Sequence, residues 1–246
     1  QIPLQVVFED DDIVVVDNNA HPDTPGEVAT TSARVVREVV QGYGSAIQRG
    51  IAETLDADLV CICEPDGTFD PDDILKLLPF TADVDVVFGS RTVRIFILSG
   101  ANMGLFLKWG NWAVAKLTEV LFNTVYLSDV GCTYRVLTRD AVDRLRPGFR
   151  STGSAFGYEM MLLTAQHRIP LVQVPVKYRP RVGQSSVTGD RRKTIEIGHE
   201  IVDRAIVRPD HPELARTVRQ RFGIGEKARG RNQHGAIARQ LVAVGN

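Results

Sequence analysis

Short β-branched runs that stop at polar or glycine-rich turns, with helix patterns between them, constrain this chain most strongly. Strand patterns cover residues 12–17, 34–40, 58–63, 84–88 and 171–178. Helix patterns follow the loop at 21–26 as far as about residue 33 and cover 45–55, 72–80, 139–145, 157–167 and 193–207. Strands that alternate with helices in this way predict an α/β fold with a mostly parallel, helix-covered sheet.

The strand pattern at 58–63 ends abruptly at an acidic corner that contains proline and glycine. Glu64 and Asp66 follow the strand directly, and alternate residues of a strand share one side. One interpretation is an ordinary acidic turn, because such clusters between periodic segments commonly form loops. The other is a metal site, because two carboxylates at the carboxyl end of a buried strand suit a divalent cation held against a diphosphate.

The composition indicates a globular domain with appendages. The chain has 246 residues, of which 43% are hydrophobic and 24% charged, and its net charge of −1 favours no association with nucleic acid. We expect one domain at residues 1–207 and a basic tail at 208–246, where eight Lys/Arg stand against three acids for a net charge of +5. Such a tail either rests on an anionic surface or extends into solvent.

A long apolar and aromatic stretch at 95–122 contains both tryptophans and is interrupted by Lys108, Lys116 and Glu119. The charges predict an amphipathic pair of helices that either packs into the core or faces lipid. No apolar run reaches the roughly 18 residues that a membrane span needs, and no signal peptide opens the chain. The three cysteines form no CxxC pair, which predicts neither a disulfide framework nor a zinc site. We therefore expect a cytoplasmic protein, peripheral at the inner face of the membrane.

Several further segments match known motifs in order along the chain. They are VVVDNNA at 14–20 with Thr24, QGYGSA at 41–46 with Gly50, EPDG at 64–67, VVFGSR at 86–91, KWGN at 108–111, DVGCTYR at 129–135, GYE at 157–159 and VPVKYRPRVGQSS at 174–186. With these motifs the chain resembles a family 2 glycosyltransferase of the GT-A fold over about residues 10–207. It is most similar to the dolichyl- or polyprenyl-phosphate mannose and glucose synthases.

The resemblance implies an inverting, metal-dependent transfer of a hexose from a UDP- or GDP-sugar to a polyprenyl phosphate. Glu64 and Asp66 are then the ligands of Mg²⁺ or Mn²⁺, which neutralises the leaving diphosphate. A flexible loop at 183–189 is expected to close over the diphosphate and exclude water. The expected donor-side residues are Asp17, Asn18, Gly42, Gly44, Asp66, Arg181 and Ser185.

The acceptor side is expected to hold cations that gather an anionic acceptor. Arg91, Lys108 and Arg135 are the candidates, and a surface ion pair is the alternative role of each. A lipid phosphate is already a nucleophile at neutral pH and needs no strong base. A hydroxyl acceptor has to lose a proton to a carboxylate, and Asp129 is the candidate base.

Two departures from the resemblance keep other functions open. Glu64 stands where the family has aspartate, and its extra methylene moves the carboxylate, so Asp66 is the safer ligand. The family's opening strand, with its V-I-P-x-x-N-E signature, is not found, so either this sequence lacks that strand or the nucleotide pocket is incomplete. The alternatives are a glycosyltransferase with a soluble acceptor and a non-catalytic sugar-nucleotide-binding protein. A Rossmann dehydrogenase is disfavoured because the glycines at 42–50 do not form G-x-G-x-x-G.

Overall fold

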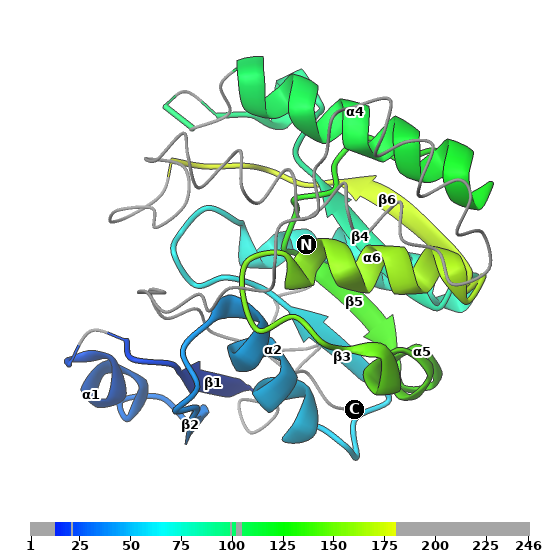
Figure 1. Ribbon diagram of the computed structural model, residues 1–246. Helices are drawn as coiled ribbons and strands as arrows, with labels where there is room; N and C mark the ends of the chain where they lie inside the picture. The colour runs from blue at the N-terminus through cyan, green and yellow to red at the C-terminus, as the bar shows by residue number, and fades with distance from the viewer. Residues whose placement is uncertain (1–12, 21, 99, 102–104, 181–246) are drawn as a thin grey trace, which may run out of the picture.

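The computed structural model describes residues 13–20, 22–98, 100–101 and 105–180, and it shows a mixed α/β fold (Figure 1). The strands are β1 (Val14–Asp17), β2 (Arg34–Arg37), β3 (Leu59–Ile62), β4 (Val86–Ser90), β5 (Arg135–Thr138) and β6 (Leu171–Pro175). The α-helices are α1 (Thr24–Val28), α2 (Tyr43–Ala52), α3 (Ile74–Leu77), α4 (Leu105–Phe122), α5 (Arg139–Leu145) and α6 (Phe156–Gln166). The predicted α/β class is confirmed.

The strands form a two-stranded parallel sheet, β1-β2, and a four-stranded sheet in the order β3-β5-β4-β6. The pair β4·β6 is parallel, whereas β5 runs antiparallel to both of its neighbours. The sequence pattern had not indicated β5, because this four-residue strand begins with an arginine and leads directly into α5. Its direction decides where the candidate site residues lie.

Alternate strand residues divide the interior into two apolar layers, as the period of a strand requires. Val60, Ile62 and Phe88 face the layer that α2, α4, α5 and α6 cover, and α6 lies between α4 and α2 in Figure 1. Cys61 and Val87 face the opposite layer, which α3 covers. The cysteines at 61, 63 and 132 are free.

Two helical segments differ from the sequence pattern. The helix expected at 72–80 is three short pieces, namely η3 (Pro71–Asp73), α3 and η4 (Leu78–Ala82). Pro79 in η4 accounts for the break after α3, because proline donates no backbone hydrogen bond inside a helix. The amphipathic pair expected at 95–122 is, among the described residues, the 3₁₀ turn η5 (Arg94–Phe96) and the single 18-residue helix α4.

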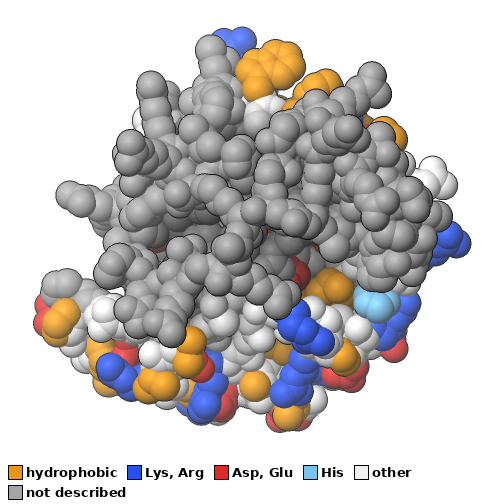
Figure 2. Space-filling view, viewed as in Figure 1, with side chains coloured by type: hydrophobic (Ala, Val, Ile, Leu, Met, Phe, Trp, Pro, Cys, Tyr) orange, Lys and Arg blue, Asp and Glu red, His pale blue; other side chains and the backbone are white. Residues whose placement is uncertain are grey.

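The outer face of α4 is apolar. Trp109, Trp112 and Val120 are 65%, 45% and 81% exposed, whereas Ala115 and Thr118 are buried beneath the helix. Figure 2 shows hydrophobic side chains gathered at the end of the molecule where α4 lies in Figure 1. Within the described part of the chain, no helix combines the length and the apolar character that crossing a membrane requires.

Candidate active site

The sheet topology brings four of the predicted site residues, Glu64, Asp66, Arg91 and Asp129, to one edge. Strands β3, β4 and β6 all point the same way, because β5 is antiparallel to β3 and β4, and β6 is parallel to β4. Glu64 and Asp66 follow β3, Arg91 follows β4, and Lys177 follows β6. Since β5 runs in the opposite direction, the segment that precedes it, residues 129–134, ends at this same edge.

The acidic corner folds as a tight turn after β3. Glu64 is 7% exposed, and Asp66 Oδ1 accepts hydrogen bonds from Thr68 N at 3.0 Å and Thr68 Oγ1 at 2.5 Å. Gly67 occupies the turn with φ of +77°, a conformation that favours glycine. No cluster of three or more His, Cys, Asp or Glu side chains suited to a metal ion occurs among the described residues. Glu64 and Asp66 supply the hard carboxylate oxygens that Mg²⁺ or Mn²⁺ prefers, and phosphate oxygens and water would have to complete the coordination of either ion.

A charged network joins the acidic corner to the segment that follows β6. Asp70 Oδ2 accepts from Lys177 Nζ at 2.8 Å and from Arg179 Nη2 at 2.6 Å, and Arg179 N donates to Thr68 O at 2.8 Å. Burial raises the pKa of Asp70, but the two cations outweigh it and hold this pKa below its ordinary value. Lys177 and Arg179 are thus already paired with protein carboxylate.

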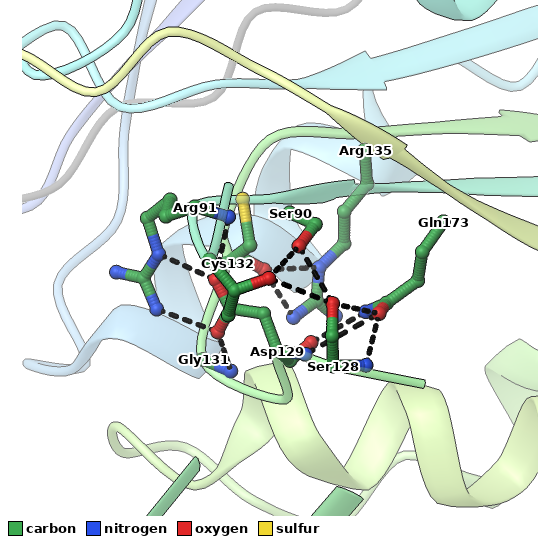
Figure 3. A network of polar contacts seen from close by, with 9 residues as sticks. Ser90, Arg91, Ser128, Asp129, Gly131, Cys132, Arg135 and Gln173 are labelled. Carbon is green, nitrogen blue, oxygen red and sulfur yellow. Dashed lines mark hydrogen bonds and ion pairs between the residues drawn. The ribbon is translucent and has the colours of Figure 1, made fainter. Parts of the chain in front are cut away.

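The centre of the site is an ion pair between Arg91 and Asp129 (Figure 3). Asp129 Oδ2 accepts from Arg91 N at 2.9 Å and from Arg91 Nε at 2.8 Å, while Oδ1 accepts from Arg91 Nη2 and Gly131 N, both at 2.9 Å. Asp129 is fully buried, and 14% of the Arg91 side chain is exposed. The pair uses Nε and Nη2 of the guanidinium, and Nη1 points away from the network in Figure 3.

This environment makes Asp129 a weak base. Burial raises its pKa, but the charge and hydrogen bonds of Arg91, with the Gly131 amide, hold that pKa below its ordinary value. Both carboxylate oxygens are occupied by donors. The geometry therefore suits Asp129 to orienting Arg91, and the proton-accepting role expected for a hydroxyl acceptor stays a prediction.

Arg135 lies in the interior. It is 1% exposed, and its guanidinium donates to Cys132 O at 2.8 Å and 3.1 Å and to Gly157 O at 2.5 Å. It also lies 5.0 Å from the Phe88 ring centroid, and burial lowers its pKa. A Cβ at Gly157 would lie 2.9 Å from Arg135 Nη2, so this glycine leaves room for the guanidinium. Arg135 thus joins the loop before β5 to the start of α6, and its predicted contact with an acceptor stays a prediction.

Asn18 and Gly42, two of the donor-side candidates, fix the path of the backbone. Asn18 is fully buried, and its amide binds the backbone at Glu38, Val40 and Gly42. Gly42 has φ of +147°, and a Cβ there would lie 2.1 Å from the oxygen of Thr152. These contacts fix the turn between β2 and α2.

The other donor-side candidates lie nearby. Asp17 Oδ1 accepts from Ala20 N at 2.9 Å and Oδ2 pairs with Arg37 at 3.1 Å, at the end of β1. A Cβ at Gly44 would lie 2.3 Å from the oxygen of Ser151, so α2 starts in close contact with that segment. Their predicted contacts with the donor stay predictions.

Four contributors to the site were not predicted as functional residues. Gln173 of β6 binds the backbone of Ser128 and Asp129 through both atoms of its amide. The hydroxyls of Ser90, Thr92 and Ser128 lie 2.9 Å from one another. The signal for Gln173 was present, since it is the polar residue on the face of its strand opposite Val172 and Val174.

Several predictions fall outside the described residues. Arg181, Ser185, the helix at 193–207 and the basic tail at 208–246 all lie beyond residue 180. Lys108 belongs to α4, but its side chain is not described. The roles of these residues stay predictions.

Comparison with known proteins agrees with this geometry. Residues 5–145 match the profile described as Glycosyl transferase family 2. The chain belongs to glycosyl transferase family 2. The family predicted from the motifs is therefore confirmed.

Curated relatives are named for sugar transfer. The low-salt glycan biosynthesis hexosyltransferase Agl6 of Haloferax volcanii is 29% identical over 71% of this chain, which spans only 41% of Agl6. The undecaprenyl-phosphate mannosyltransferase of Micrococcus luteus is 27% identical, over 76% of this chain and 79% of its own length. The dolichyl-phosphate hexose transferase of Haloferax volcanii is 26% identical, over 67% of this chain and 68% of its own length.

Solved structures support the fold. Glucosyl-3-phosphoglycerate synthase from Mycobacterium tuberculosis, crystallised with Mn²⁺, UDP and glucosyl-3-phosphoglycerate, superposes with a TM-score of 0.57 at 16% identity. The match covers 93% of this chain and 75% of that one. The predicted GT-A architecture is confirmed by this likeness.

Proposed function

We propose that the chain transfers a hexose, with inversion, from a UDP- or GDP-sugar to a polyprenyl phosphate, in a reaction that depends on Mg²⁺ or Mn²⁺. The observation that carries the proposal is the juxtaposition of the acidic corner after β3 with the Arg91–Asp129 pair after β4. One part suits a metal and a diphosphate, and the other presents an oriented cation to an anionic acceptor. The names of the Micrococcus luteus and Haloferax volcanii relatives support the lipid-phosphate acceptor.

The state of Asp129 favours a phosphate acceptor over a hydroxyl acceptor. A hydroxyl needs a base in the transition state, but the pKa of the carboxylate expected for that task is held below its ordinary value, and its oxygens already accept hydrogen bonds from Arg91 and Gly131. A phosphate monoester already carries the attacking oxygen as an anion. Direct displacement by that oxygen at the anomeric carbon inverts its configuration.

Glu64 and Asp66 would hold the metal ion. When bound, the metal supplies Lewis-acid stabilisation of the leaving diphosphate. The protein contributes a carboxylate whose orientation is fixed by Thr68, at an edge where the segment after β6 is tied to the corner by Asp70. The segment beyond residue 180, with Arg181 and Ser185, is proposed to cover the diphosphate.

We propose that the protein works as a peripheral protein at the cytoplasmic face of the membrane that contains the acceptor. The exposed tryptophans of α4 support this placement, because Trp is enriched where protein meets the membrane–water interface. The basic tail at 208–246 is proposed to contribute attraction to anionic lipid.

The test is a panel of UDP- and GDP-hexoses with Mg²⁺ or Mn²⁺, each with and without a polyprenyl phosphate. We expect one donor to yield a lipid-linked hexose and a nucleoside diphosphate, and Asp66→Ala to reduce transfer by at least about 100-fold. Asp72→Ala is the matched control, because that carboxylate is exposed and lies six residues further along the same acidic segment. Undiminished transfer by Asp66→Ala would remove the metal assignment.

The same panel separates the competing functions. Binding of a nucleotide sugar without release of nucleoside diphosphate would favour the non-catalytic binding protein. Release that is stimulated by a soluble phosphate ester or sugar, and not by the polyprenyl phosphate, would favour a soluble acceptor.

A further inference from the structure

Gln173 contacts two consecutive peptide groups of the segment that carries Asp129. Its Oε1 accepts from Ser128 N at 2.6 Å and from Asp129 N at 3.3 Å, and its Nε2 donates to Asp129 O at 2.5 Å. Oε1 also lies 3.3 Å from Ser128 Oγ. A side-chain amide combines an acceptor and a donor, so one residue can satisfy both kinds of backbone group (Figure 3).

The preceding residue is held in a similar way from α4. Glu119 Oε1 accepts from Leu127 N at 2.6 Å, and Lys116 Nζ donates to Leu127 O at 2.9 Å. Glu119 and Lys116 also pair with each other at 2.6 Å. The stretch 127–129 has no regular secondary structure, and side chains from α4 and β6 take the place of ladder or helix hydrogen bonds.

The two residues that Gln173 holds are the two that fix the cationic side of the site. Asp129 binds Arg91 through both of its carboxylate oxygens. Ser128 Oγ lies 2.9 Å from the hydroxyls of Ser90 and Thr92, the neighbours of Arg91 in sequence. A displacement of the peptide between Ser128 and Asp129 would therefore be transmitted to Arg91 from both sides.

We propose that Gln173 is a positioning residue, which sets the direction of the Arg91 guanidinium by fixing the Ser128–Asp129 peptide. The inference rests on the acceptor-binding role proposed for Arg91 and adds the residue that controls it. Gln173 itself does not touch the acceptor. Its loss is expected to change acceptor use and to leave the donor side, at the acidic corner, unaffected.

Three variants test this assignment. Gln173→Met keeps the length of the side chain and removes both polar atoms. Gln173→Glu keeps the bonds that Oε1 accepts and loses the one that Nε2 donates, so it should behave more like the wild type than Gln173→Met does. Gln48→Met is the matched control, because Gln48 also donates from its amide to a backbone oxygen, that of Ser151 at 3.0 Å, away from Arg91.

The first readout does not require turnover. The Nε–H NMR signal of Arg91, identified by its loss in Arg91→Lys, should be sharp and slowly exchanging in the wild type because Asp129 binds it at 2.8 Å. We expect the signal to broaden or vanish in Gln173→Met, to persist in Gln173→Glu and to be unchanged in Gln48→Met. An unchanged signal in Gln173→Met would overturn the inference.

The second readout is steady-state transfer to a polyprenyl phosphate. We expect Gln173→Met to lower kcat/KM for the acceptor by about 10- to 100-fold, since a misplacement of about 1 Å can cost that much. The KM for the nucleotide sugar should stay the same. Equal effects on both substrates would indicate a merely structural role and overturn the inference. If the wild type transfers nothing to any acceptor, the proposed function fails, while the NMR signal still decides whether Gln173 orients Arg91.

Discussion

Replacing Asp129 by asparagine tests whether the buried ion pair organises the site. Asp129 is fully buried, and it accepts hydrogen bonds from Arg91 and Gly131. Asparagine offers one oxygen in place of two and no charge, so the Arg91 guanidinium would be left buried without its counter-charge. Breaking a buried pair by removing one partner costs about 3–5 kcal/mol of unfolding free energy. In a protein of this size the melting temperature should fall by about 6–20 °C.

A double-mutant cycle isolates the pair. Arg91→Met removes the guanidinium and keeps an unbranched side chain, so Asp129→Asn in that background no longer leaves a buried cation. We expect Asp129→Asn to lower the unfolding free energy by at least about 1 kcal/mol less in the Arg91→Met background than in the wild type. Asp140→Asn is the control, because Asp140 is 71% exposed in a surface pair with Arg144 and should change stability by less than about 0.5 kcal/mol.

The difference in unfolding free energy between the wild type and Asp129→Asn depends on pH in a definite direction. The pKa of Asp129 is lower in the folded protein than its ordinary value of 3.8, so its contribution is present above that value and is lost as the pH falls through the folded pKa. Urea unfolding should therefore give the same difference in unfolding free energy between the wild type and Asp129→Asn at every pH from 5 to 8. This reasoning would be refuted if Asp129→Asn lowered the unfolding free energy by less than about 1 kcal/mol or if the two substitutions were strictly additive. It would also be refuted if the difference in unfolding free energy disappeared near pH 6.

Three further predictions concern other parts of the molecule. Gly42→Ala should lower the unfolding free energy measured in urea by more than about 1 kcal/mol, because the φ of Gly42 is +147° and a Cβ there would meet a backbone oxygen. Gly153→Ala should lower it little, because a Cβ at Gly153 would meet no atom within 4 Å. Trp109 and Trp112 are the two tryptophans of the chain, so its tryptophan emission should shift to shorter wavelength on anionic vesicles, and unchanged emission would contradict a membrane-facing α4. Asp70→Asn should lower the melting temperature by about 2–4 °C at pH 7 and by less below about pH 4, because the pKa of Asp70 is lowered, and an equal loss at both pH values would contradict its pairing.

The sequence was sufficient to predict the elements whose hydrophobic pattern is strong. The apolar runs at β1, β3, β4 and β6 were recognised because consecutive or alternating β-branched residues leave few other structures. The strand β5 was missed, since four residues that begin with a charged side chain carry too little pattern. The burial of Arg135 in this strand supplies the tertiary reason, because its charge is satisfied by backbone oxygens that the sequence does not reveal.

The motifs did not reveal which of the predicted site residues contact one another. Arg91 was predicted to bind the acceptor and Asp129 to act as a base, and no contact between the two residues was predicted. Their pairing depends on the antiparallel direction of β5, which brings the segment before it alongside the end of β4. A pKa follows from burial and partners, so the weak basicity of Asp129 could not be inferred from the motif alone.

The reversed strand β5 also explains how one edge of the sheet can serve two substrates. The acidic corner follows β3 and Arg91 follows β4, and β5 lies between these strands with its leading segment at their carboxyl ends. Within that segment, Gln173 fixes residues 128 and 129 from the far side of β4, whereas Tyr134, next to β5, donates from its hydroxyl to Pro71 O at 2.9 Å. Changes at 127–129 are therefore expected to alter how an acceptor is held without altering how a metal and a diphosphate are held.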